Sequence, residues 1–190
     1  MQANYAAAVL EIFKIISEHN NEHYPGKVAA IYLAGGAAVH FYVNARVSDD
    51  VDAIMEPYRP AIPADLEAVW TNKEGELKAL SFDYQYNPTF GLLDEGYQER
   101  AYHWKDIDNN IKLYVLHPID LVITKLVRYS DSDIADIEAL IRLKSFNIDT
   151  FEKLALKALS ESVGISPDRG LHHTIGWVKE LYSNFKSQES

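Results

Sequence analysis

The spacing of apolar residues changes along the chain, from mixed strand and helix spacing in the first part to helix spacing alone after residue 117. Apolar residues three and four positions apart predict a helix over residues 5–18. An unbroken apolar run predicts a strand over residues 28–33 that is buried on both faces. The remaining expectations for this part are helices at 37–42 and 64–69 and strands at 51–55, 77–86, 101–104 and 111–116.

Helix signals dominate from Pro118 onward, because proline suits the first helical position and an apolar stripe follows it. Three further helix starts are expected, at Ser130 with Asp133, at Asp149 with Glu152, and at Ser166-Pro167. We therefore predict an α/β (α+β) fold, with a mixed sheet and flanking helices at 1–116 and a helical part at 117–190 packed on it.

Two acidic residues alternate with apolar ones shortly after a Gly-Gly turn. Gly35 and Gly36 follow an apolar strand, and Asp50 and Asp52 come after the next short helix. Successive side chains of a strand point to opposite faces, so Asp50 and Asp52 project from one face about 7 Å apart, while Asp49 points away. Such carboxylates suit a hard cation such as Mg²⁺. Backbone N–H groups at a helix start favour phosphate. Together they indicate a metal-dependent phosphoryl site.

Two motifs carry a resemblance to nucleotidyltransferases that share the fold of DNA polymerase β-like enzymes. The first is Gly35-Gly36-Ala37-Ala38 followed by Arg46-Val47-Ser48-Asp49-Asp50-Val51-Asp52. The second is a Lys-Leu helix at 118–128, followed by Asp133 and Asp136. The first string is more closely similar to bacterial proteins of the abortive-infection toxin type (AbiEii and MenA relatives) and to nucleotidyltransferases of unknown function. The resemblance covers roughly residues 28 to 142.

The resemblance implies that Asp50 and Asp52 hold one or two Mg²⁺ ions and that Gly35 and Gly36 seat a nucleoside triphosphate. Polymerase-like transfer uses a third carboxylate on an adjacent strand. Asp83, an acid between aromatic residues in a predicted strand, is the candidate for it. Each assignment has an alternative. Asp50 and Asp52 could lie on a solvated acidic strand face, and the glycines could form an ordinary tight turn. Asp83 could be an edge-strand acid that faces water.

Four basic or hydroxyl residues could contact the phosphates: Arg46, Ser48, Lys125 and Arg128. Arg46 could instead pair with a neighbouring carboxylate. Lys125 and Arg128 share a helix face. They could equally pair with the acids at 131, 133 and 136.

The charge balance limits the substrate classes. Acids outnumber bases 28 to 18, giving a net charge of −10. This weighs against a stable nucleic-acid binder and favours a small nucleotide or a protein partner, with RNA a less suitable acceptor. The chain has no cysteine and no apolar run long enough to cross a membrane, which fits a cytoplasmic protein. The His172-His173 pair has no acidic ligand at i+4 spacing, so no zinc site is predicted there.

The predicted function is Mg²⁺-dependent transfer of a nucleoside monophosphate from a triphosphate to an acceptor hydroxyl. By resemblance, the protein could be the toxin of a toxin–antitoxin or phage-defence module, with RNA or protein as acceptor. Two other functions stay open. One is a catalytically silent binding or antitoxin protein of the same fold, and the other is a small-molecule transferase of the aminoglycoside-modifying kind.

Overall fold

The structure is a computed structural model, and its chain forms two compact units. The described residues are 4–44, 47–86, 92–162 and 169–188. The first unit comprises residues 1–86 and 101–116, and the second comprises residues 87–100 and 117–190. This grouping places residues 87–100 with the C-terminal helices. The division into two domains at 116/117 stays a prediction.

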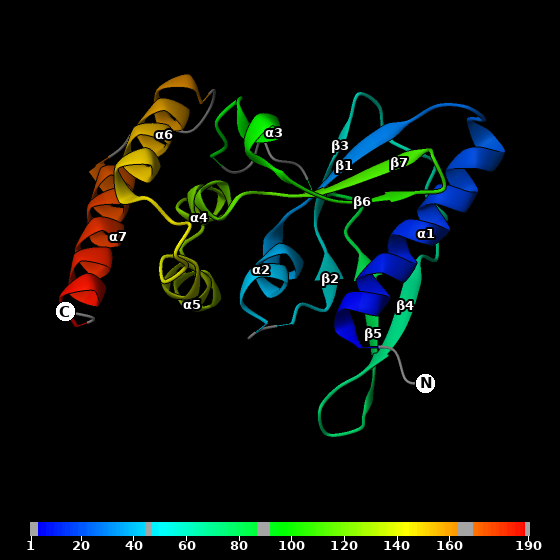
Figure 1. The fold of residues 1–190 in the computed structure, drawn as a ribbon, viewed down its shortest axis with the longest axis horizontal. Coiled ribbons are helices and arrows are strands. Elements are labelled where there is room, and N and C mark those ends of the chain that lie inside the picture. Colours follow the sequence, from blue (N-terminus) through cyan, green and yellow to red (C-terminus); the bar gives the residue numbers. More distant parts are fainter. Residues whose placement is uncertain (1–3, 45–46, 87–91, 163–168, 189–190) are drawn as a thin grey trace. The chain divides into compact units, whose positions relative to one another are not determined.

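The first unit is a mixed α/β structure (Figure 1). Its elements are α1 (Tyr5–His23), β1 (Ala29–Leu33), α2 (Gly35–Val43), β2 (Asp50–Val51), β3 (Ala53–Glu56), β4 (Glu67–Thr71), β5 (Leu77–Phe82), β6 (Tyr102–Ile107) and β7 (Ile111–Val115). One sheet has the strand order β3-β1-β7-β6 and the other β2-β5-β4. Each sheet contains both parallel and antiparallel pairs. The predicted α/β class with a mixed sheet is confirmed.

The helix α1 buries one apolar face against the strands of this unit, packing on β4 and β5 (Figure 1). Ile12, Phe13 and Ile16 are fully buried. The Phe13 ring meets the Phe82 ring edge-on, with centroids 6.2 Å apart. In β1, consecutive residues from Ile31 to Leu33 are buried. The predicted burial of both faces is therefore confirmed for β1, whereas Val28, which the prediction included, is exposed and precedes the strand.

The helix predicted at 64–69 is wrong, because this part of the chain leads into the strand β4. Ala68 and Trp70 are buried while Glu67 and Val69 are exposed, which is the two-residue period of a strand. The Trp70 ring packs edge-on against Tyr5 of α1, with centroids 5.2 Å apart. The helix prediction stopped short of Trp70, the residue that completes the alternation.

The strand predicted at 77–86 ends earlier, at Phe82. Asp83 Oδ1 accepts a hydrogen bond of 2.7 Å from the Gln85 N–H, the local side-chain turn that aspartate favours. This turn competes with continued strand pairing and ends β5.

The second unit is helical in its described part. Its helices are α3 (Tyr97–Arg100), α4 (Pro118–Lys125), α5 (Asp131–Leu140), α6 (Ile148–Glu161) and α7 (Arg169–Gln188). Pro118 occupies the first turn of α4, and Ser130 and Asp133 form a capping box, as predicted. The cap predicted at Asp149 is wrong, since Asn147 Oδ1 accepts the Thr150 N–H at 2.9 Å. The start predicted at Ser166-Pro167 lies outside the described residues.

Charged contacts explain why the short segment with α3 groups with the C-terminal helices. Arg100 donates two hydrogen bonds to the buried Asp120 carboxylate of α4, at 2.6 and 3.0 Å. It also pairs with Asp94 at 2.7 Å, and Asp94 in turn pairs with Lys157 of α6 at 2.7 Å. Burial raises the pKa of Asp120, and the Arg100 contact only partly offsets this. The network ties α3, α4 and α6 together.

In the part of the chain that the structure describes, no helix is both long enough and apolar enough to pass through a membrane.

Candidate functional site

Gly35 and Asp52 lie in direct contact. Gly35 is the first residue of α2 and has a φ of +55°, a backbone conformation that favours glycine. A Cβ atom at position 35 would lie 1.8 Å from Asp52 Oδ2. The carboxylate therefore occupies the space that any other side chain would need. The structure brings together the Gly-Gly turn and one of the two predicted acids.

Asp52 also marks the point where the chain passes from one sheet to the other. Asp50 and Val51 form β2 of the three-stranded sheet, and Ala53 begins β3 of the four-stranded sheet. Between them, the Asp52 carbonyl accepts the Ala34 N–H at 2.9 Å. This bond fixes the backbone of Asp52 beside the residue that precedes α2.

The start of α2 provides a favourable position for an anion. Its N-cap residue, Ala34, makes no side-chain capping bond, and Gly36 and Ala37 in the first turn are buried. A helix N-terminus carries partial positive charge from its first backbone N–H groups. Phosphate placed here would meet the backbone at close range, because the two glycines carry no side chain.

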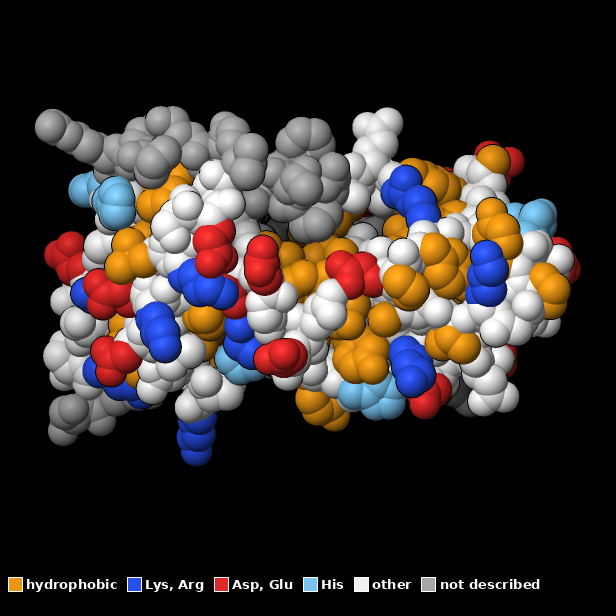
Figure 2. Space-filling model, turned by 90° about the horizontal axis from the view of Figure 1, so that it is seen from above, with side chains coloured by type: hydrophobic (Ala, Val, Ile, Leu, Met, Phe, Trp, Pro, Cys, Tyr) orange, Lys and Arg blue, Asp and Glu red, His pale blue; other side chains and the backbone are white. Residues whose placement is uncertain are grey.

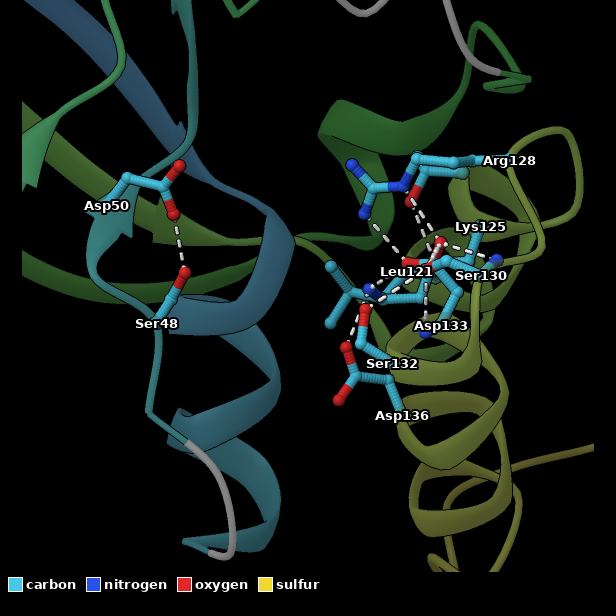
Figure 3. Close-up of polar contacts among 10 residues, drawn as sticks. Ser48, Asp50, Leu121, Lys125, Arg128, Ser130, Ser132, Asp133 and Asp136 are labelled. Atoms are coloured by element: carbon cyan, nitrogen blue, oxygen red, sulfur yellow. Dashed lines mark hydrogen bonds and ion pairs between the residues drawn. The ribbon is translucent and has the colours of Figure 1, made fainter.

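Asp50 is oriented by a chain of hydrogen bonds that ends in α1. Ser48 Oγ donates to Asp50 Oδ1 at 2.5 Å (Figure 3), and the Ser48 N–H donates to the Tyr5 hydroxyl at 3.2 Å. Tyr5 is 3% exposed, so its hydroxyl is held by a packed core. The sequence analysis missed Tyr5, because no local pattern connects it with a residue 43 positions away.

Asp83 directly follows β5, the strand that pairs with the Asp50-containing strand β2. β2 and β5 run parallel, with Asp50 opposite Ser81 and Val51 opposite Phe82. The Asp83 N–H donates to the Val51 carbonyl at 3.0 Å. This bond holds the Asp83 backbone beside Val51, the residue before Asp52. The role of Asp83 as a third carboxylate stays a prediction.

The donor set fits a hard divalent cation in kind, since all three side chains offer carboxylate oxygens. Among the described residues, Asp50, Asp52 and Asp83 do not form a group whose ligand atoms all lie within 4.8 Å of one another. Asp50 bonds to Ser48, and Asp83 bonds to the Gln85 N–H. Like charges repel in the absence of a cation. Binding a metal would therefore require side-chain rotation of these acids.

Lys125 and Arg128 lie in the second unit and pair with acids of α5 (Figure 3). The Lys125 ammonium is 3.1 Å from Asp133 Oδ1 and 2.7 Å from Asp136 Oδ2, and all three residues are buried. Arg128 makes two hydrogen bonds of 2.8 Å to Asp133, although its side chain is 72% exposed. These ion pairs are the alternative to phosphate contact that the sequence left open for Lys125 and Arg128. Phosphate contact stays a prediction for both residues.

The surroundings of Asp133 keep its carboxylate charged and give it a structural role. Burial alone raises the pKa of Asp133, but hydrogen bonds from Arg128 and Ser130 and the charge of Lys125 outweigh burial. The pKa of this carboxyl therefore lies well below its usual range. Asp133 stays charged at neutral pH and anchors α4 to α5. The remaining candidate, Arg46, lies outside the described residues.

Figure 2 shows the distribution of charged side chains on one face of the molecule. On the face shown in Figure 2, acidic and basic side chains are interspersed within each unit and do not gather by sign. In the sequence as a whole, 28 acidic residues outnumber 18 basic residues. This face offers no extended basic surface that would follow a nucleic-acid backbone.

The mixed α/β unit, with Asp52 against the Gly-Gly start of α2, is consistent with the nucleotidyltransferase class. Residues 8–187 match the family model described as nucleotidyltransferase of unknown function (DUF6036), and the chain belongs to this family. The predicted resemblance to nucleotidyltransferases is thereby confirmed. No curated protein and no solved structure matches the chain.

Proposed function

We propose that this protein transfers a nucleoside monophosphate from a nucleoside triphosphate to an acceptor hydroxyl with the help of Mg²⁺. The observation that carries the proposal is the contact between Gly35 and Asp52. It puts a carboxylate suited to a metal ion directly against a helix start suited to phosphate.

Each residue has a distinct role in this proposal. Asp50 and Asp52 hold the metal, and Ser48 and Tyr5 fix the direction of the Asp50 carboxylate. Gly35 and Gly36 begin α2, whose first backbone N–H groups bind the triphosphate. When bound, Mg²⁺ neutralises the triphosphate and makes its α-phosphorus more open to attack.

The proposed transfer forms one bond to phosphorus, breaks another and moves one proton. The acceptor oxygen forms a bond to the α-phosphorus, while the bond from that phosphorus to the bridging oxygen of the β-phosphate breaks. Pyrophosphate leaves with the electron pair of the broken bond. The Asp83 carboxylate takes the proton of the acceptor hydroxyl, since Asp83 directly follows the neighbouring strand β5 and its N–H bonds to the Val51 carbonyl.

The first experiment is calorimetric titration with ATP, CTP, GTP and UTP, each with and without Mg²⁺. We expect Mg²⁺-dependent binding of at least one triphosphate to the wild type and its loss in Asp50→Ala/Asp52→Ala. Asp49→Ala is the matched control, because Asp49 is an exposed neighbour. Its carbonyl bond to the Ser81 N–H does not need the side chain.

Binding by the wild type that persists in the double variant would contradict the assigned site. The absence of any triphosphate binding would contradict the enzymatic proposal. Pyrophosphate release separates transfer from binding. Binding without release, with every acceptor class tried, would favour the catalytically silent binding or antitoxin protein.

We further propose that this protein is the toxin of a toxin–antitoxin or phage-defence module, as the resemblance to abortive-infection toxins suggests. Protein is the acceptor that best fits a net charge of −10. Growth arrest on expression in a bacterial host, relieved by Asp50→Ala/Asp52→Ala, would support this setting. Unimpaired growth together with labelling of purified aminoglycosides would instead support the small-molecule transferase.

A further inference from the structure

A second group of potential metal ligands lies on α1, outside the nucleotidyltransferase site. His19, Glu22 and His23 belong to the last two turns of this helix. One ligand atom from each residue can be chosen so that all three lie within 4.8 Å of one another. Residues at i, i+3 and i+4 share one face of a helix. The three side chains therefore converge on one point at the surface.

The two histidines are already arranged as a pair. Their ring centroids are 4.2 Å apart, and the ring planes are inclined by 49°. Nδ1 of His19 lies 3.9 Å from Glu22 Oε2, so the carboxylate borders the same point. His19 is half-buried with 30% of its side chain exposed, whereas 74% of the Glu22 side chain is exposed.

A backbone contact selects the nitrogen that His23 offers. His23 Nδ1 lies 2.9 Å from the carbonyl oxygen of His19. A carbonyl oxygen only accepts hydrogen bonds, so Nδ1 carries the proton in this contact. In the neutral imidazole, Nε2 is then the nitrogen that carries the lone pair. Metal-binding histidines commonly use one ring nitrogen for the metal and the other for such a backbone contact.

The opposite face of the same turns is fixed to the rest of the first unit. Ser17 and Asn20 are fully buried. The Asn110 side-chain amide donates to the Ser17 carbonyl at 2.8 Å, and the Asn20 amide donates to the Tyr58 hydroxyl at 3.2 Å. The backbone that presents the three ligands is therefore anchored. Ligands on anchored elements hold their geometry better than ligands on loops.

We propose that His19, Glu22 and His23 form a Zn²⁺ site on α1. Two imidazole nitrogens and one carboxylate oxygen suit Zn²⁺, whereas Mg²⁺ prefers oxygen ligands alone. Zn–N bonds are about 2.0–2.1 Å, so small side-chain rotations bring the three ligand atoms onto one ion. The fourth tetrahedral position is left for water or another ligand. The ion ties two successive turns of α1 together and stabilises the end of this helix.

The test is calorimetric titration of the chelator-treated protein with Zn²⁺ alone. We expect one equivalent to bind, with affinity reduced about tenfold or more in His19→Ala and in His23→Ala, at least the loss that changes beyond the direct ligands already cause. His172→Ala/His173→Ala is the matched control. This pair is also exposed on a long helix, but neighbouring positions do not face one another. The control should bind Zn²⁺ like the wild type.

The Asp50→Ala/Asp52→Ala variant separates this site from the nucleotidyltransferase site and should retain Zn²⁺ binding. A thermal unfolding midpoint that rises with Zn²⁺ in the wild type, but not in His19→Ala, would support the site. Far-ultraviolet circular dichroism checks that each variant folds. Failure of the wild type to bind Zn²⁺, or equal affinity in the wild type and His19→Ala, would overturn the proposal.

Discussion

Gly35 is the residue at which backbone conformation and site chemistry depend most directly on one another. Its φ of +55° disfavours other residues, and the Asp52 carboxylate fills the space beside its Cα atom. Two independent physical reasons thus require glycine at one position. Only the second of them involves the acid that we assign to the metal.

Comparison of Gly35→Ala with Gly26→Ala should separate these two effects. We expect a loss of about 1–3 kcal/mol in the free energy of unfolding from backbone strain, and a loss of Mg²⁺-dependent triphosphate binding because Asp52 is displaced. Chemical denaturation and calorimetry measure the two quantities. Gly26→Ala is the control, since Gly26 has a φ of +77° but no described atom lies within 4 Å of the Cβ position. Equal binding defects in both variants would contradict the role of the contact.

At the scale of the elements, the junction between α4 and α5 depends on buried charge. Lys125, Asp133 and Asp136 are each at most 3% exposed. Burying charges is costly unless they are paired, so the contribution of each residue depends on the presence of the others. The junction is therefore sensitive to the loss of any one partner.

Lys125→Met should destabilise the protein by about 3–5 kcal/mol, because it leaves two buried carboxylates without their lysine. Urea denaturation of the wild type and the variant measures the difference. Lys144→Met is a suitable control, since Lys144 is exposed. A change below about 1 kcal/mol, the typical value of an exposed ion pair, would show that the pair is not important for stability.

The same junction predicts a dependence on pH. The folded-state pKa of Asp133 lies below its ordinary value. Its contribution to stability is therefore fully present above the unfolded-state pKa, about 3.9, and is lost as pH falls below it towards the folded-state pKa. Urea denaturation between neutral and acidic pH should show a smaller loss of stability in Asp133→Asn than in the wild type. Asp131→Asn, at an exposed position of α5, should retain the wild-type slope. Identical slopes in the wild type and Asp133→Asn would contradict this assignment.

The elements that the sequence predicted well are those whose signals are local. The proline in the first turn of α4 and the capping box of Ser130 and Asp133 are each contained in a short stretch. β4 was misread because its alternation is completed only by Trp70, whose burial depends on α1. For Lys125 the sequence allowed both phosphate contact and ion pairing. The three-dimensional packing provides the burial and the acidic partners that favour the second.

The site required long-range information as well. The contact of Tyr5 with Ser48 joins residues 43 positions apart, and no periodicity indicates it. The spacing of His19, Glu22 and His23 was readable as i, i+3 and i+4, but the fixed opposite face of α1 was not. Local motifs therefore predict candidate site residues, while packing determines what holds these residues in place.

At the scale of the whole chain, the net charge of −10 is the property most relevant to partners. We expect no measurable binding of unstructured RNA at micromolar protein concentrations in about 150 mM salt, because few phosphates would be neutralised. Fluorescence anisotropy with labelled RNA measures this, with a basic RNA-binding protein as positive control. Tight binding with a steep salt dependence would instead indicate a local basic surface.

The contact between Gly35 and Asp52 also has a consequence for how this family varies over time. A relative that lost the acid at the position of Asp52 would no longer need to keep that space clear beside the helix start. Its glycine would then be retained only for backbone reasons, and a residue tolerant of positive φ, such as asparagine, could replace it. The two positions are therefore expected to change together in lineages that abandon nucleotide chemistry. A paired replacement would mark descendants that use this fold as a scaffold.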